Sequence, residues 1–168
     1  MNRTPLAVAL IALALPAGCD ETDPAGPPEV VYGSSVCDFC NMIISDERFA
    51  TATIVVDDRD RPAARLFDDF NCQADGEAGL APDAILARWV HDHATRAWIR
   101  ADEAHFVRAA SLRTPMASRV AAFADAGAAD AAASEWGGET LSFPELHRAL
   151  TGAQASDHHP TEPEETPS

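Results

Sequence analysis

The fold is decided by one stretch of sequence, Phe49-Ala50-Thr51-Ala52-Thr53-Ile54-Val55-Val56, which is followed by the polar turn Asp57-Asp58-Arg59-Asp60 and by a second run at residues 63–67. β-Branched and aromatic residues favour strands, and a short cluster of Asp between two such runs is typical of a tight connection. The stretch therefore predicts a β-hairpin.

A helix is predicted directly after this hairpin. Asp68 or Asp69 can cap its N-terminus, and the helix is expected to cover residues 70–76. A second helical stretch, residues 82–87, precedes a short strand at residues 88–92. The order from the hairpin to this strand is β-β-α-β.

The second half of the chain repeats that order. We expect strands at residues 104–109 and 119–124, an Ala-rich helix near residues 128–136 that stops at Gly137-Gly138, and a strand at residues 139–141. Ser142 and Glu145 then match a capping box, which opens a last helix ending near Leu150. We therefore predict an α+β fold of two tandem ββαβ modules in one compact body over residues 32–150.

Charge excludes one class of partner. The chain has 168 residues, and its 12 basic residues, all Arg, stand against 27 acidic ones, which gives a formal net charge of −15. Phosphate backbones and anionic lipid surfaces need clustered basic side chains, and here the Arg residues are scattered. We therefore expect no nucleic-acid partner, whereas cations are compatible with this charge.

The N-terminus has the features of a lipoprotein signal peptide. The apolar run at residues 6–15 is too short to cross a bilayer core of ~30 Å. Ala17 and Gly18 precede Cys19, which resembles a bacterial lipobox, although Pro16 stands where that pattern usually has Leu. We expect residues 1–18 to be removed and Cys19 to be lipidated. The alternative is an ordinary cleaved signal with a free Cys19.

The two ends of the mature chain are expected to lie outside the folded body. Residues 19–31 are predicted to form a lipid anchor and flexible tether because they combine several Pro with no apolar periodicity. Residues 151–168 are predicted to form a disordered acidic tail, since they lack large apolar residues. This arrangement predicts a body anchored at the periplasmic face of the cell membrane.

The candidate chemistry lies in Cys37-Asp38-Phe39-Cys40-Asn41-Met42. Two thiols and a thioether within six residues are soft donors, which suit Cu(I), whereas Zn(II) takes thiolate or imidazole and seldom thioether. Cys37, Cys40 and Met42 are therefore candidate Cu(I) ligands. With Cys19 lipidated, Cys37, Cys40 and Cys72 are an odd number, so a disulfide framework cannot use all of them.

Other residues with donor atoms are weaker candidates. Met116 follows a proline that fixes the backbone, so its thioether could be presented at a fixed point. Cys72 is interpreted as a buried small hydrophobe or a partner thiol in preference to a ligand. His91 and His93 alternate on a strand, so their imidazoles share a face that can bind Cu(II) or Zn, but they are interpreted in preference as a solvated edge-strand pair. The tail pair His158-His159 is expected to bind metal weakly at most.

Two alternatives remain open at this stage. Cys37 and Cys40 could form a redox-active pair in a periplasmic thiol–disulfide lipoprotein, although such pairs normally stand at a helix start after a strand, and here the pair precedes a strand. A structural zinc or interaction module is the second alternative. No nucleophile–base pair, phosphate loop or paired-carboxylate signature is present in the sequence, so we do not expect an enzyme.

An ordered series of motifs resembles the NosL family, lipoproteins accessory to nitrous oxide reductase. The resemblance covers about residues 36–150. The motifs that carry it are Cys40-Asn41-Met42-Ile43-Ile44, Phe67-Asp68-Asp69, Trp98-Ile99-Arg100-Ala101, Thr114-Pro115-Met116-Ala117-Ser118 and Gly137-Gly138-Glu139-Thr140-Leu141.

The resemblance implies a Cu(I)-binding periplasmic chaperone built from two ββαβ modules. Such a protein supplies copper for the copper–sulfide cluster of nitrous oxide reductase by docking on a membrane ABC-type complex that has a periplasmic subunit. The family's Cys-X-Met motif falls on Cys40 and Met42, and its later methionine falls on Met116. Asn41 stands where the family's familiar form has Gly, and Cys37 is a thiol that only part of the family carries.

Overall fold

The computed structural model describes residues 23–157, with the backbone alone for residues 153–157. The predicted signal peptide, Cys19 and the pair His158-His159 lie outside the described residues. The elements, in chain order, are β1 (Thr51–Val56), β2 (Pro62–Phe67), α1 (Phe70–Glu77), the short 3-10 helix η1 (Pro82–Ala84), β3 (Ile85–His91), β4 (Trp98–Arg100), β5 (His105–Arg108), β6 (Val120–Phe123), α2 (Ala126–Trp136), β7 (Glu139–Leu141) and α3 (Phe143–Asp157).

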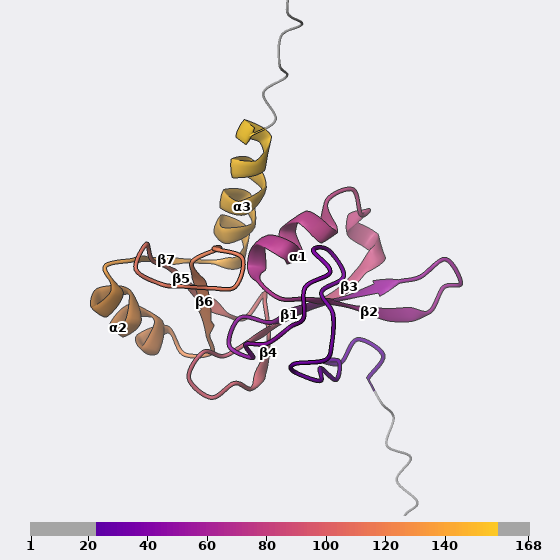
Figure 1. Cartoon of the computed structure of the whole chain (residues 1–168), viewed down its shortest axis with the longest axis horizontal. Helices are drawn as coiled ribbons and strands as arrows, with labels where there is room; N and C mark the ends of the chain where they lie inside the picture. The colour runs from indigo at the N-terminus through magenta and orange to yellow at the C-terminus, as the bar shows by residue number, and fades with distance from the viewer. Residues whose placement is uncertain (1–22, 158–168) are drawn as a thin grey trace, which may run out of the picture.

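The strands form two antiparallel sheets, in the orders β2-β1-β3-β4 and β6-β5-β7. In each sheet the first strand of the module lies between the other two strands of its ββαβ unit. Figure 1 shows α1 over the first sheet and α2 beside the second, with α3 rising away from them. The predicted α+β fold of two tandem ββαβ modules is confirmed, with β4 and α3 as additions to the repeated unit.

Short-range contacts explain several element boundaries. The hairpin turn is held by Asp57 Oδ1, which accepts hydrogen bonds from the backbone N–H groups of Arg59 and Arg61 at 2.8 and 3.0 Å. Asp69 caps α1, and Asp125 caps α2 by accepting from the Ala128 N–H at 2.8 Å.

Three elements differ from the sequence prediction. The helical stretch expected at residues 82–87 is only the 3-10 turn η1, because the chain enters β3 already at Ile85. The last helix has the expected capping box, in which Glu145 Oε2 accepts from the Ser142 N–H at 2.8 Å. This helix extends to Asp157 instead of ending near Leu150, since no proline interrupts the chain before Pro160. The strand β4 was not predicted.

Part of the predicted tether is held against the first sheet. The indole N–H of Trp89, on β3, donates to the carbonyl oxygen of Ala25 at 2.8 Å. Val30 and Tyr32 pack against a buried cluster that contains Cys37 and Phe67. The segment that leads to the cysteine motif is therefore fixed to the body from residue 25 onward. No helix within residues 23–157 combines the length and the hydropathy needed to span a bilayer.

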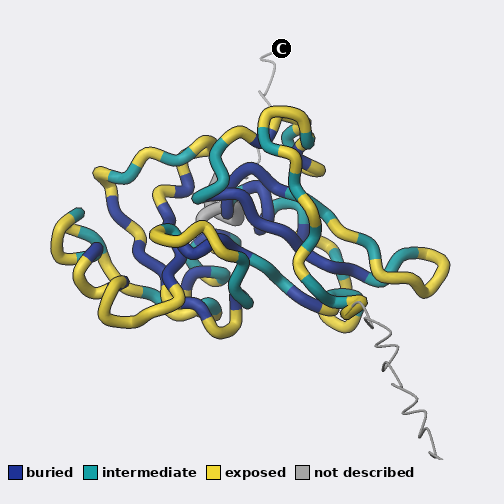
Figure 2. Tube along the Cα trace, turned by 90° about the horizontal axis from the view of Figure 1, so that it is seen from below, coloured by how far each residue is buried: buried dark blue, intermediate teal, exposed yellow. Residues whose placement is uncertain are grey.

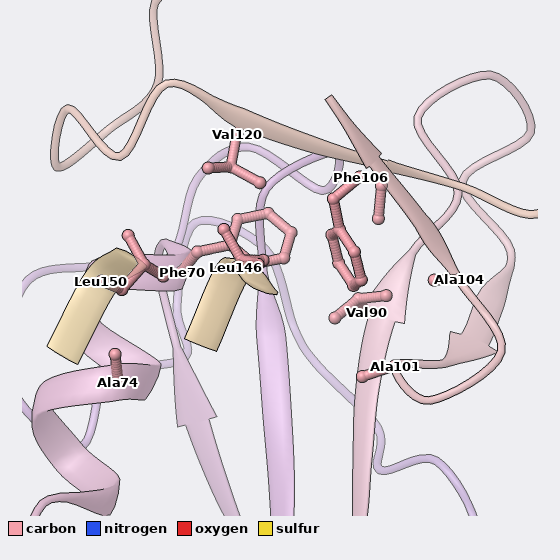
Figure 3. Close-up of a cluster of buried hydrophobic side chains, with 10 residues drawn as sticks. Phe70, Ala74, Val90, Ala101, Ala104, Phe106, Val120, Leu146 and Leu150 are labelled. Carbon is pink, nitrogen blue, oxygen red and sulfur yellow. The ribbon is translucent and has the colours of Figure 1, made fainter. Parts of the chain in front are cut away.

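The largest core cluster joins the two modules. Phe70 of α1, Val90 of β3, Phe106 of β5, Val120 of β6 and Leu146 of α3 converge in it (Figure 3). Buried residues follow the sheets, while the hairpin tip and the connecting loops are exposed (Figure 2). Because one cluster draws on both sheets, the two modules form one hydrophobic body.

The modules also meet at a backbone junction. Asp92 forms a parallel bridge with Ala122 of β6, and the N–H of His93 donates to the Ala122 carbonyl at 2.8 Å. The side chain of Asp92 accepts from the Ala124 N–H at 3.0 Å. These bonds fix the end of β3 against the start of the α2 connection.

Candidate metal centre

The cysteine motif forms a closed turn. The Asn41 N–H donates to the Cys37 carbonyl at 3.0 Å, and the Cys37 N–H donates to the Met42 carbonyl at 2.8 Å. Asn41 has a backbone φ of 60°, in the left-handed region that glycine adopts freely and that asparagine tolerates better than most residues. The same conformation explains how Asn41 can stand where the family's familiar motif has Gly.

The turn is fixed to the end of β2. The Asp38 N–H donates to the Leu66 carbonyl at 2.8 Å, and the Leu66 N–H donates to Asp38 Oδ2 at 2.5 Å. Since α1 begins three residues after Phe67, this pairing brings the turn close to the first turn of the helix. Cys72, the third residue of α1, is thereby placed beside the motif.

Three thiols meet at this point. The sulfur atoms of Cys37, Cys40 and Cys72 all lie within 4.8 Å of one another. Cys37 and Cys72 are buried, and Cys40 is partly exposed. The two buried thiols belong to an apolar cluster completed by Ile44, Ala50 and Phe67. Two of the three thiols therefore lie in an apolar cluster, and the third, that of Cys40, reaches the surface.

The two buried thiols differ in acidity. The hydrogen bond from the Cys72 thiol lowers the pKa of Cys37 to about 5, against the opposing effect of burial and with further help from the backbone N–H groups of Phe39, Cys40 and Asp68. The hydrogen bond to Cys37 and burial together raise the pKa of Cys72. The hydrogen bond between the two thiols therefore shifts their pKa values in opposite directions, with Cys37 the more acidic of the two.

A buried carboxyl group, that of Asp68, lies close enough to Cys37 for their charges to interact. Asp68 is 4% exposed, and its Oδ1 has no hydrogen-bond partner among the described residues. Burial raises the pKa of Asp68, and the negative charge of Cys37 raises it further. Burying anionic groups together without a cation is costly, so a bound metal ion would relieve the electrostatic strain at this site.

The two methionines occupy different positions. Met116 lies in the loop before β6, and with Phe39, Asn71 and Cys72 it borders a cleft of about 320 Å³. Met116 therefore shares this cleft with Cys72, one of the three thiols. Met42 closes the cysteine turn through its carbonyl, and its side chain is 58% exposed. Whether either thioether binds metal stays a prediction.

The interpretation of the histidines was wrong. β3 is an inner strand, and His91 at its end is buried: the Tyr32 hydroxyl lies 2.7 Å from Nε2, and the Arg96 carbonyl oxygen lies 2.7 Å from Nδ1. His93 packs among aromatic rings, those of Phe49, Phe123 and Trp136. Burial lowers the pKa of both histidines. His91 is thus part of the packing of the first module, and His93 packs against rings of the second module, so the two imidazoles do not form a solvated pair.

Two residues of the site were missed or underrated from the sequence. Cys72 was ranked as a small hydrophobe or partner thiol before a ligand, and the structure places it within reach of a metal shared with Cys37 and Cys40. Asp69 was identified only as a possible helix cap, yet it also binds the Met116 loop. The available signal was the position of Cys72 in the first turn of a capped helix directly after a hairpin.

Apolar side chains surround the exposed part of the site. The described residues with exposed large hydrophobic side chains are concentrated between residues 31 and 43, and they are Val31, Val36, Phe39, Met42 and Ile43, with Leu86 and Met116 elsewhere. Val36 and Ile43 are paired across the base of the cysteine turn. The thiol group therefore opens onto an apolar part of the surface.

Comparison with known proteins relates the chain to one family of known fold. The NosL family model matches residues 29–151 of this chain. The crystal structure of the copper chaperone NosL from Shewanella denitrificans matches with a TM-score of 0.59 and 20% sequence identity, over 73% of this chain and 99% of that one. At this identity the structural match establishes a shared fold. No curated protein matches the sequence.

Proposed function

Because this chain belongs to the NosL family, we propose that it is a Cu(I) chaperone whose cargo binds to the sulfur atoms of Cys37, Cys40 and Cys72, with Met42 and Met116 as thioether donors. The observation that carries the proposal is the meeting of three thiols, from two separate segments, within 4.8 Å of one another. A carrier role requires no catalytic group.

The donor set fits a soft cation. Metal–thiolate bonds of about 2.3 Å, the length known for zinc, place two sulfur atoms on one ion at most about 4.6 Å apart. The observed separations are close to this limit, so one ion can be shared after small side-chain movements. Thiolate and thioether donors together favour Cu(I) over zinc.

The burial of the donors suits transfer. Cys37 and Cys72 are buried while Cys40 reaches the surface, so a sulfur or imidazole of an acceptor can approach the bound copper from the side of Cys40. Copper then moves by ligand exchange: the acceptor's donor bonds to the ion before the bond to Cys40 breaks. Cu(I) stays Cu(I) throughout, and no electron is transferred.

We place this function at the periplasmic face of the cell membrane, with the body anchored through a lipid on Cys19. The cargo is delivered to a membrane ABC-type complex with a periplasmic subunit, for maturation of the copper–sulfide cluster of nitrous oxide reductase. This part of the proposal is supported by family membership and by the lipobox-like sequence at residues 16–19. The membrane contact is made through the lipid, and no nucleic acid is involved.

The geometry does not favour the thiol–disulfide alternative. Oxidoreductases with this cysteine spacing use a helix N-terminus to stabilise the attacking thiolate. Cys37 and Cys40 lie in a turn that leads to an isolated bridge at Ile43, not to a helix. The Cys37 side chain is also fully buried, which impedes attack of its sulfur on a disulfide substrate.

An anaerobic Cu(I) titration against a competing chelator tests the proposal, using the full mature chain with Cys19→Ser. The parent protein should bind one equivalent, and Cys40→Ser should lose most of its affinity. Met42→Ala and Met116→Ala test the two thioethers singly. Leu86→Ala is the matched control, since Leu86 and Met116 are both 38% exposed. Equal affinity for Cu(I) in the parent and in Cys40→Ser would refute the proposal.

A further inference from the structure

Asp69 has more hydrogen-bond partners than a helix cap needs. We propose that it is a positioning residue, which holds the Met116 loop of the second module against the thiol-bearing first turn of α1. This inference deepens the proposed function and rests on it. It concerns how the sulfur donors of two modules are brought to one place.

The carboxylate is fully buried and its two oxygens have separate partners. Oδ1 accepts from the Phe70 N–H at 2.7 Å and from the Ser118 hydroxyl. Oδ2 accepts from the Thr114 hydroxyl at 2.7 Å, the Met116 N–H at 2.8 Å and the Ser118 N–H at 3.2 Å. Four of these five donors belong to the loop that carries Met116, and only one belongs to the helix.

The other helix cap shows the difference. Asp125, which caps α2, accepts from the Ala128 N–H through Oδ1. A cap of this kind needs one side-chain oxygen. All three hydrogen bonds that Oδ2 of Asp69 accepts come from the loop, so helix capping alone does not explain why an aspartate stands at this position.

The loop needs this support because its backbone is strained. Ala117 and Arg119 have φ values of 58° and 61°, in the left-handed region that costs non-glycine residues about 1–2 kcal/mol each. Hydrogen bonds to a buried carboxylate are among the stronger ones in proteins and can maintain such a conformation. Asp69 thereby fixes the direction from which Met116 approaches the cleft.

A second bond comes from the same turn of helix. The Asn71 side-chain N–H donates to the Met116 carbonyl at 3.0 Å. The N–H of Met116 is bound by Asp69 and its C=O by Asn71, while Cys72 follows directly in the chain. Two side chains at the start of α1, those of Asp69 and Asn71, therefore locate the backbone of Met116 relative to Cys72, and Met116 and Cys72 line the same cleft.

The test uses Asp69→Ser, since serine is a good cap but offers one oxygen in place of two. Without copper, the Met116 amide should exchange with solvent roughly tenfold faster or more, because it loses a bond to a charged acceptor. With copper, the affinity of Asp69→Ser should fall as far as that of Met116→Ala, and the double variant should fall no further. Combined with Met42→Ala, a residue that Asp69 does not hold, Asp69→Ser should lower the copper affinity further than either single variant does. Asp125→Ser is the matched control and should leave copper affinity unchanged.

The inference would be overturned if Asp69→Ser left the exchange rate of the Met116 amide unchanged. It would also be overturned if the losses of copper affinity added in the Asp69→Ser/Met116→Ala double variant. Should Asp69→Ser not fold, Asp69→Asn gives the same test, because it keeps one accepting oxygen. A failure of the proposed function is distinguishable: copper affinity would then be insensitive to Cys40→Ser as well, while the exchange rate of the Met116 amide would still report on Asp69.

Discussion

Replacing Gly76 by alanine sets two effects of similar size against each other. Gly76 is the last but one residue of α1, where alanine gains at most about 1 kcal/mol of helix propensity. A Cβ at this position would stand 2.4 Å from Cε1 and 2.9 Å from Cζ of Phe67. Phe67 is fully buried in the cluster that contains Cys37 and Cys72, so its ring has little room to move.

Overpacking of this kind costs about 1–3 kcal/mol, which exceeds the gain in propensity. We therefore expect Gly76→Ala to lower the free energy of unfolding by about 1 kcal/mol in urea denaturation followed by circular dichroism. Gly152→Ala is the control, because a Cβ there meets nothing within 4 Å and should add up to about 1 kcal/mol. A Gly76→Ala protein as stable as the parent would refute the packing argument.

Two further predictions concern titration. In a Cys19→Ser, Cys40→Ser background, Cys72→Ala should raise the pKa of Cys37 from about 5 towards 9.0, since the Cys72 thiol is the main group that lowers it; an unchanged midpoint of thiolate absorbance against pH would contradict this. Burial lowers the pKa of His91 and His93 below 6.5, so the unfolded chain binds protons that the folded chain does not, and the free energy of unfolding should fall as the pH drops below 6.5. His93→Phe, which keeps an aromatic ring between Phe49 and Trp136, should make that fall shallower in denaturation experiments across the same range.

The sequence predicted those elements whose causes lie within a few residues. The hairpin depends on a β-branched run and on Asp57, whose carboxylate reaches only to Arg61. The caps at Asp69 and Asp125 and the capping box of α3 are equally local. The NosL resemblance, carried by an ordered series of such segments, is confirmed by the family match over residues 29–151.

Features that depend on distant contacts were not predictable in the same way. β4 has only three residues and exists through its pairing with β3, in which Trp89 faces Arg100. Nothing near Cys72 in the chain indicates Cys37, because they meet only after the β1–β2 hairpin returns the chain to the cysteine turn. The interpretation of His91 failed for the same reason, since its partners Tyr32 and Trp98 come from other segments. The candidate ligands Cys40, Met42, Cys37 and Met116 stay predictions that the titrations above address.

The distribution of the sulfur atoms along the chain has a mechanical consequence. Cys40 and Cys72 stand 72 − 40 = 32 residues apart, and Met116 belongs to the other module. An ion held by all of them acts as a reversible cross-link that closes long loops, and it stabilises only the folded chain. The copper-loaded form would thus be stiffer than the copper-free form. Under the proposed function, loss of the ion would remove this cross-link and loosen the surface around it.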